Sequence, residues 1–208
     1  MFNSKDFKNK GLESLKGSWV PALKASVFFA AIYVFIVFFL QYTFLEALFV
    51  ISITGILNLA LVMFFTLLTQ TRNQAFFSDF LDCLNFWVTG IIASFWMTLW
   101  IILWSLLFFV PGMIKVIAYS QTYFILAENP EMSVRKAVTL SKIITKGYKG
   151  DIFIFYLSFI GWIFLSMLTG GIGFIFLIPY FTSSSVFQYR FLKKQALETK
   201  IVEQADFQ

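Results

Sequence analysis

The sequence contains no histidine and a single cysteine, Cys83, and only 13% of its 208 residues are charged, against about 25% in an average soluble domain. The lack of histidine removes the commonest metal ligand and general base, and one cysteine cannot form an intramolecular disulfide. The apolar segments contain no paired carboxylates and no serine with a base, which membrane hydrolases require. Glu128, Glu131 and Asp151 stand at the aqueous boundary, where solvated charges are expected. These absences argue against an enzyme and predict no catalytic site, cofactor or metal.

Hydrophobic residues, in contrast, make up 59% of the chain. Apolar stretches of about 20 residues, each long enough to cross about 30 Å of hydrocarbon, recur along its whole length. The sequence therefore predicts an all-α fold, a polytopic transmembrane helical bundle that forms one integral membrane domain over residues 1–208. Six spans are predicted, at residues 25–45, 47–69, 84–110, 113–127, 152–168 and 172–192. They pair into hairpins 25–69, 84–127 and 152–192, separated by cytoplasmic segments 1–24, 70–83, 128–151 and 193–208.

The positions of the basic residues predict the orientation, because Lys and Arg are retained on the cytoplasmic side. With the N-terminus inside and six crossings, every Lys and Arg except Lys115 is cytoplasmic. Span 113–127 reaches only about 22 Å. If it did not cross, nine basic residues would lie outside, so we expect it to cross and both termini to be cytoplasmic.

Two cytoplasmic segments have the pattern of helices that lie in the membrane interface. In SVRKAVTLSKIITKG, with Ser133 as N-cap and Gly147 as the residue after the helix, the apolar residues share one face. The opposite face carries a basic strip, defined as Arg135, Lys142, Lys146 and Lys149. In AFFSDFLDCL, Asp79 and Asp82 form an acidic strip that projects away from the apolar face. The two strips are expected to pair with each other, or the basic strip with anionic lipid of the inner leaflet.

Polar residues within the spans have two interpretations. Lys115 follows the predicted turn Pro111-Gly112 and either extends to the outer headgroups or pairs with Glu46; the alternative is a charge that faces a solute. Pro179, the serine run Ser183, Ser184 and Ser185, and Gln121 either pack helices together or line a polar path. Gly55, Gly90 and Gly161 are expected to let helices approach closely.

Four motifs stand in order along the second half: PGMIKVIAYSQTYFILAENP, SKIITKGYKGDIF, LSFIGW and GIGFIFLIPY. They resemble a bacterial integral-membrane family, domain of unknown function 975, in which an aspartate is more usual at the position of Glu128. The resemblance extends over essentially the whole chain, although only as a pattern before residue 100. It implies a multi-pass protein of the bacterial cytoplasmic membrane, and it supplies no active site.

Two functional hypotheses follow. The first is a non-catalytic membrane protein that acts by contact, as an accessory subunit of a membrane complex or a self-protection (immunity-type) protein against a membrane-active peptide. The second is a small carrier for an apolar, lipidic or peptidic solute. The expected partners are the bilayer with its anionic inner leaflet and a membrane protein or peptide. Nucleic acid is not expected, because no soluble basic domain is predicted.

Overall fold

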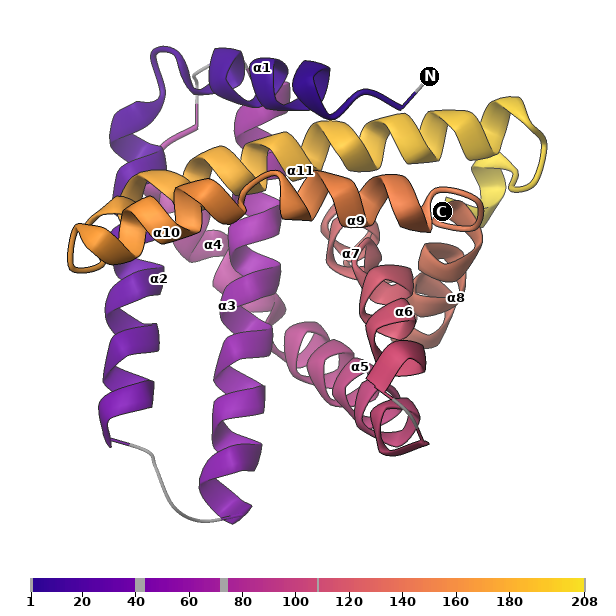
Figure 1. The fold of residues 1–208 in the computed structure, drawn as a ribbon, viewed down its shortest axis with the longest axis horizontal. Coiled ribbons are helices and arrows are strands. Elements are labelled where there is room, and N and C mark those ends of the chain that lie inside the picture. Colours follow the sequence, from indigo (N-terminus) through magenta and orange to yellow (C-terminus); the bar gives the residue numbers. More distant parts are fainter. Residues whose placement is uncertain (1, 40–43, 72–74, 108, 208) are drawn as a thin grey trace.

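The chain folds almost entirely into helices (Figure 1). The computed structural model describes residues 2–39, 44–71, 75–107 and 109–207, and no strand occurs in these ranges, which confirms the all-α prediction for them. The helices are α1 (Ser4–Leu15), α2 (Trp19–Phe39), α3 (Phe44–Gln70), α4 (Phe77–Cys83), η1 (Leu84–Phe86), α5 (Trp87–Leu107), α6 (Phe109–Tyr119), α7 (Thr122–Glu128), α8 (Val134–Ile144), α9 (Lys149–Leu157), α10 (Ile160–Leu168), α11 (Gly173–Glu198) and η2 (Gln204–Phe207).

Within the described ranges, three segments are long and apolar enough to cross a membrane: Glu46–Gln70, Phe77–Leu106 and Lys149–Leu168. A fourth unit passes the same test when Ser4–Leu15 and Trp19–Phe35, which are bent by 105° relative to each other, are counted together. Length and composition thus support a membrane protein with three or four such units. The predicted count of six spans stays a prediction.

Three predicted segments have different boundaries in the structure. Segment 113–127 is not one helix, because α6 ends at Tyr119 and α7 begins at Thr122. Segment 152–168 is likewise interrupted between α9 and α10. Segment 172–192 belongs to a longer helix that continues to Glu198, since the Lys, Gln, Ala and Leu residues after position 192 favour helix. That helix ends before Lys200, which has a φ of 51°.

Helix α3 is the centre of the fold and packs against α2, α4, α5, α7 and α11. In Figure 1, α2 and α3 descend side by side, α5 and α6 form a second pair, and α10 and α11 run across the upper part of the molecule. Each of the segments α2–α3, α5–α7 and α9–α11 follows a shorter helix, α1, α4 or α8 respectively. The core between them is mainly aliphatic and also contains buried aromatic side chains, among them the fully buried Phe64, Phe65 and Phe80.

Two glycines bring α3 and α5 together. A Cβ atom built on Gly55 would lie 2.5 Å from the carbonyl oxygen of Gly90, and one built on Gly90 would lie 2.9 Å from Cα of Ile56. The predicted role of Gly55 and Gly90 in close helix approach is therefore confirmed. The same prediction for Gly161 is wrong, because nothing lies within 4 Å of a Cβ at that position.

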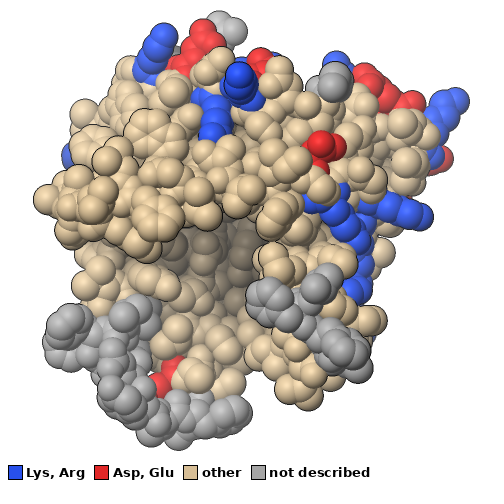
Figure 2. Space-filling view, in the orientation of Figure 1, with Lys and Arg blue, Asp and Glu red and all other residues tan. Residues whose placement is uncertain are grey.

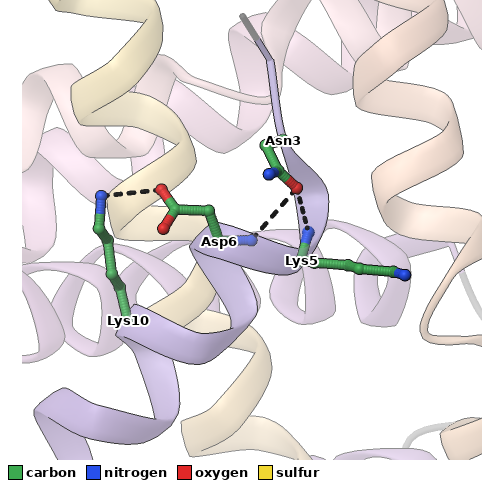
Figure 3. A network of polar contacts seen from close by, with 4 residues as sticks. All are labelled: Asn3, Lys5, Asp6 and Lys10. Carbon is green, nitrogen blue, oxygen red and sulfur yellow. Dashed lines mark hydrogen bonds and ion pairs between the residues drawn. The ribbon is translucent and has the colours of Figure 1, made fainter.

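Helix α1 begins with a local polar network and lies along α11. The Asn3 side chain caps α1 by accepting from the amides of Lys5 and Asp6, and Asp6 pairs with Lys10 at 2.8 Å (Figure 3). Further along α1, a Cβ on Gly11 would lie 2.7 Å from the backbone nitrogen of Ser184. The close contact between α1 and α11 thus depends on the absence of a side chain at Gly11.

Charged side chains are unevenly distributed on the surface. Figure 2 shows most Lys, Arg, Asp and Glu residues of this face along its upper and right-hand edges, and a broad, largely uncharged surface over α10 and the lower helices, with acidic atoms at the lower left. The same view shows a hollow below the layer that contains α10, between the α2–α3 pair and the α5–α6 pair. Uncharged outer helices below a charged edge are the arrangement expected beside lipid.

Candidate functional site

The break between α6 and α7 organises the polar residues of the interior. Helix α6 closes at Ser120, whose amide and hydroxyl both donate to the carbonyl of Ile117. Gln121 follows as the residue before α7 and is fully buried. Its side-chain Nε2 donates to the Ser120 hydroxyl at 2.8 Å, while its Oε1 has no partner among the described residues. A helix that is interrupted inside a protein leaves backbone groups that need partners.

Helix α8 supplies those partners. The Ser141 hydroxyl donates to the carbonyl of Ala118 at 2.7 Å and accepts from the amide of Gln121 at 3.2 Å. Ser141 is fully buried on the face of α8 that also contains Ala137 and Ile144. One hydroxyl therefore satisfies a carbonyl before the break and an amide after it.

A cavity of about 260 Å³ lies beside the break. Apolar side chains supply most of its lining, and we call it the polar cavity because hydroxyl and amide groups also line it. Ser120 and Tyr123 line it from the break and α7, Tyr156 from α9, and Asn58 from α3. Thr182 and Ser185 complete its polar lining from α11. The cavity lining thus comprises hydroxyl and amide groups from several helices among its apolar side chains, and no charged residue belongs to its described lining.

Of the predicted residues of α11, only Ser185 belongs to the described lining of this cavity, and Pro179, Ser183 and Ser184 do not. Pro179 is buried inside α11, and Ser184 lies against Gly11 and donates to the carbonyl of Tyr180. Ser183 is also buried, and its hydroxyl has no partner among the described residues. Ser185, the next residue, lines the cavity. Thr182 and Ser185 are three residues apart, so their hydroxyls lie on the same side of α11. This spacing is visible in the sequence and indicates a shared polar face.

Lys115 lies on α6 and is partly exposed. Its ammonium is 4.4 Å from the ring centroid of Trp104 on α5, a cation–π contact. Lys115 does not line the polar cavity. The Glu46–Lys115 pair stays a prediction.

The basic strip and the acidic strip do not pair in the described part of the chain. Arg135, Lys142 and Lys146 are exposed, Lys149 is partly exposed, and no salt bridge within the described ranges involves the basic strip. Arg135 lies 4.8 Å from the Trp96 ring and Lys142 lies 5.4 Å from the Tyr119 ring. Asp79 instead accepts from the amide of Phe76 at the start of α4, and Asp82 is exposed.

Sequence reasoning missed a second polar cluster. Glu128, expected to be solvated at the aqueous boundary, accepts from the Tyr189 hydroxyl at 2.7 Å and pairs with Lys193 at 2.5 Å. The adjacent Asn129 side chain donates to the carbonyl of Phe207, and the Lys193 ammonium lies 4.5 Å from the Phe207 ring. These contacts join α7, α11 and η2. In the sequence, the only sign of this cluster was the acidic residue directly before Asn129-Pro130 at the end of an apolar run.

The described part of the chain contains no group of three or more His, Cys, Asp or Glu side chains arranged to hold a metal ion. A family model described as "Protein of unknown function (DUF975)" matches residues 96–196, slightly less than half of the chain. We refer to residues 96–196, the segment that the family model matches, as the DUF975 region. The resemblance to this family is therefore confirmed over those residues. No curated protein and no solved structure matches the chain significantly.

The DUF975 region contains both polar arrangements described above. It includes the α6–α7 break with Ser141, most of the polar cavity lining, and Glu128 with Tyr189 and Lys193. It also includes the whole basic strip. Asn58, on α3, contributes to the cavity from outside the region.

Proposed function

We propose that this protein is a non-catalytic, multi-pass protein of the bacterial cytoplasmic membrane that acts by contact, as an accessory subunit or an immunity-type protein. The charged edge and both termini are proposed to lie in the cytoplasm. This orientation is supported by the gathering of charge along one edge in Figure 2 and by the position of both chain ends in the upper part of Figure 1.

The basic strip on α8 and the start of α9 is the proposed contact surface. The observation that carries the proposal is that its cations have no salt bridge within the described ranges while the opposite face of α8 is fixed in the core. Long cationic side chains that have no internal ion pair and project from an anchored helix suit an anionic surface on a partner protein or peptide. Anionic headgroups are the second source of such charge.

Charge reversal tests the contact surface. Lys142→Glu, Lys146→Glu and Lys149→Glu together are compared with a control in which the exposed Lys5, Lys24 and Lys200 are changed to Glu. Each protein is extracted from its native membrane in lipid nanodiscs and analysed by native mass spectrometry. We expect a stoichiometric protein or peptide that the wild type and the control retain and the triple variant loses. Retention of the same partner by all three proteins, or no protein or peptide partner on the wild type, would overturn the proposal.

The second candidate is a carrier, and the polar cavity beside a broken helix favours it. Transporters commonly place substrate groups at interrupted helices. A carrier must expose its site alternately to the two membrane faces. Ser185→Cys in a Cys83→Ser background, treated with a charged maleimide in right-side-out and inverted vesicles, tests this. Labelling from both faces supports a carrier, and labelling from one face or neither contradicts it.

A further inference from the structure

A wide apolar groove runs along the outer side of α2. It has a volume of about 990 Å³ and lies between α2 residues 27–35 and the turn that joins α10 to α11. The turn contributes Gly170 and Gly171, both with positive φ, and a Cβ on either would meet nothing within 4 Å. The groove is therefore open at this turn, and except for Tyr33 its described lining side chains are apolar.

The groove and the polar cavity are neighbours in space. Phe29 of α2 and Ile178 of α11 line both. The combined space is amphipathic: about 990 Å³ of apolar groove adjoins about 260 Å³ lined in part by hydroxyl and amide groups. Binding sites for small molecules typically have volumes of about 300–1,000 Å³ and place a few polar groups in an apolar pocket.

The absence of charged residues from the described lining indicates which amphipathic molecules can bind. No Lys, Arg, Asp or Glu belongs to the described lining of the groove or the cavity. An ionised phosphate placed there would lose its hydration without a compensating cation, which is costly. Hydroxyl and ester groups, in contrast, find hydrogen-bonding groups there. Asn58 donates one N–H to the carbonyl of Thr54 and keeps its second N–H and its oxygen, and the Ser185 hydroxyl, which donates to the carbonyl of Phe181, can still accept.

We propose that the groove and the cavity together bind a neutral, hydroxyl-bearing lipid of the diacylglycerol type. Its polar end occupies the cavity beside the α6–α7 break, and its acyl chain lies in the groove along α2. This inference goes beyond the contact function, because retention of a lipid here does not involve the basic strip.

The test uses the full-length protein in nanodiscs of phosphatidylcholine that contain small, equal amounts of dioleoylglycerol and dioleoylphosphatidic acid. Native mass spectrometry measures which lipid stays bound as collision energy rises. We expect dioleoylglycerol to be retained in preference to the phosphatidic acid. Thr182→Val with Ser185→Ala should weaken its retention roughly thirtyfold, since two lost hydrogen bonds of about 1 kcal/mol each amount to about 2 kcal/mol. Ala31→Trp, which places a ring in the groove, should abolish it.

The matched control is Ala47→Trp, an exposed position on α3 outside both spaces. Equal loss in Ala31→Trp and Ala47→Trp, preference for the phosphatidic acid, or no retained lipid on the wild type would each overturn the proposal. A photoactivatable diacylglycerol on the wild type gives a second measurement that needs no variant. Crosslinks on α2 residues 27–35 and on α11 support the site, whereas crosslinks confined to α5 contradict it. Failure of this site leaves the charge-reversal test of the basic strip unaffected.

Discussion

The buried Ser141 hydroxyl accepts a hydrogen bond from the backbone amide of Gln121, 20 residues earlier in the chain, at 3.2 Å. It also donates to the carbonyl of Ala118, so α8 holds both sides of the α6–α7 break. Two residues of the basic strip, Arg135 and Lys142, lie on the exposed side of the same helix. Helix α8 therefore contacts the α6–α7 break through its buried side and carries part of the proposed contact surface on its exposed side.

Removal of the Ser141 hydroxyl should destabilise the protein. Ser141→Ala leaves a buried amide and a buried carbonyl without their partner, which costs about 1–3 kcal/mol of the free energy of unfolding. The control is Thr139→Ala on the exposed face of α8, where the hydroxyl bonds to the carbonyl of Arg135. We expect this change to stay within about 0.5 kcal/mol. Thermal unfolding in detergent measures both, and an equal effect of the two variants would refute the role of Ser141.

The Glu128–Lys193 pair should contribute more to stability than an exposed ion pair. Both side chains are only 18% exposed, and Glu128 also accepts from Tyr189. We expect a double-mutant cycle of Glu128→Gln and Lys193→Met to give a coupling energy of about 1–3 kcal/mol, the range of charge-assisted hydrogen bonds. The control cycle uses Lys194→Met and Glu198→Gln.

That control pair is 73% and 53% exposed and 3.7 Å apart. Its expected coupling energy is about 0–0.5 kcal/mol, since solvent screens surface pairs. High salt should weaken the control coupling and leave the Glu128–Lys193 coupling nearly unchanged. Similar couplings for both pairs would show that Glu128 is solvated, as the sequence had suggested.

The apolar runs of the sequence predicted helices well, but not where those helices break. Ser133 caps α8 by accepting from the amide of Lys136, and Gly147 follows the helix with a positive φ, both as predicted. The predicted turn at Pro111-Gly112 is wrong, because both residues lie in the first turn of α6, where proline is tolerated. The break at Ser120 contains neither Pro nor Gly. Only a tertiary contact, through Ser141, accounts for it.

The candidate site was predictable only in part for a similar reason. Gln121 and Asn58 stand out as polar residues in apolar runs, and the structure places both at or beside the cavity. Tyr123 and Tyr156 do not stand out, because tyrosine is common in membrane segments as an interfacial residue. Their convergence depends on how α7 and α9 pack, which no local pattern of residues specifies.

Two glycine-to-alanine substitutions should have different effects on stability. Gly55 lies in the α3–α5 contact, whereas Gly161 lies on α10 with no neighbour close to its Cβ position. Gly55→Ala places a methyl group 2.5 Å from the backbone of Gly90, so α3 and α5 must separate. We expect a loss of about 1–3 kcal/mol, the usual cost of overpacking. Gly161→Ala meets nothing within 4 Å and replaces a helical glycine, so it should be neutral or stabilise by up to ~1 kcal/mol. Denaturation midpoints of the two variants measure this difference. A tolerated Gly55→Ala would contradict the close packing.

Double-mutant cycles at Lys115 distinguish two candidate partners of its ammonium group, the Trp104 ring and the Glu46 carboxylate. Its contact with Trp104 predicts that Lys115→Met and Trp104→Leu couple by about 0.5–1 kcal/mol in a double-mutant cycle of unfolding. The sequence suggested Glu46 as the partner, and a cycle of Lys115→Met with Glu46→Gln measures that pair in the same assay. We expect the coupling to Trp104 to be the larger, because its ring faces the ammonium at 4.4 Å. A larger coupling to Glu46 would establish an ion pair between the first two hairpins. If neither pair couples, the lysine stem serves only to carry its charge to the headgroups.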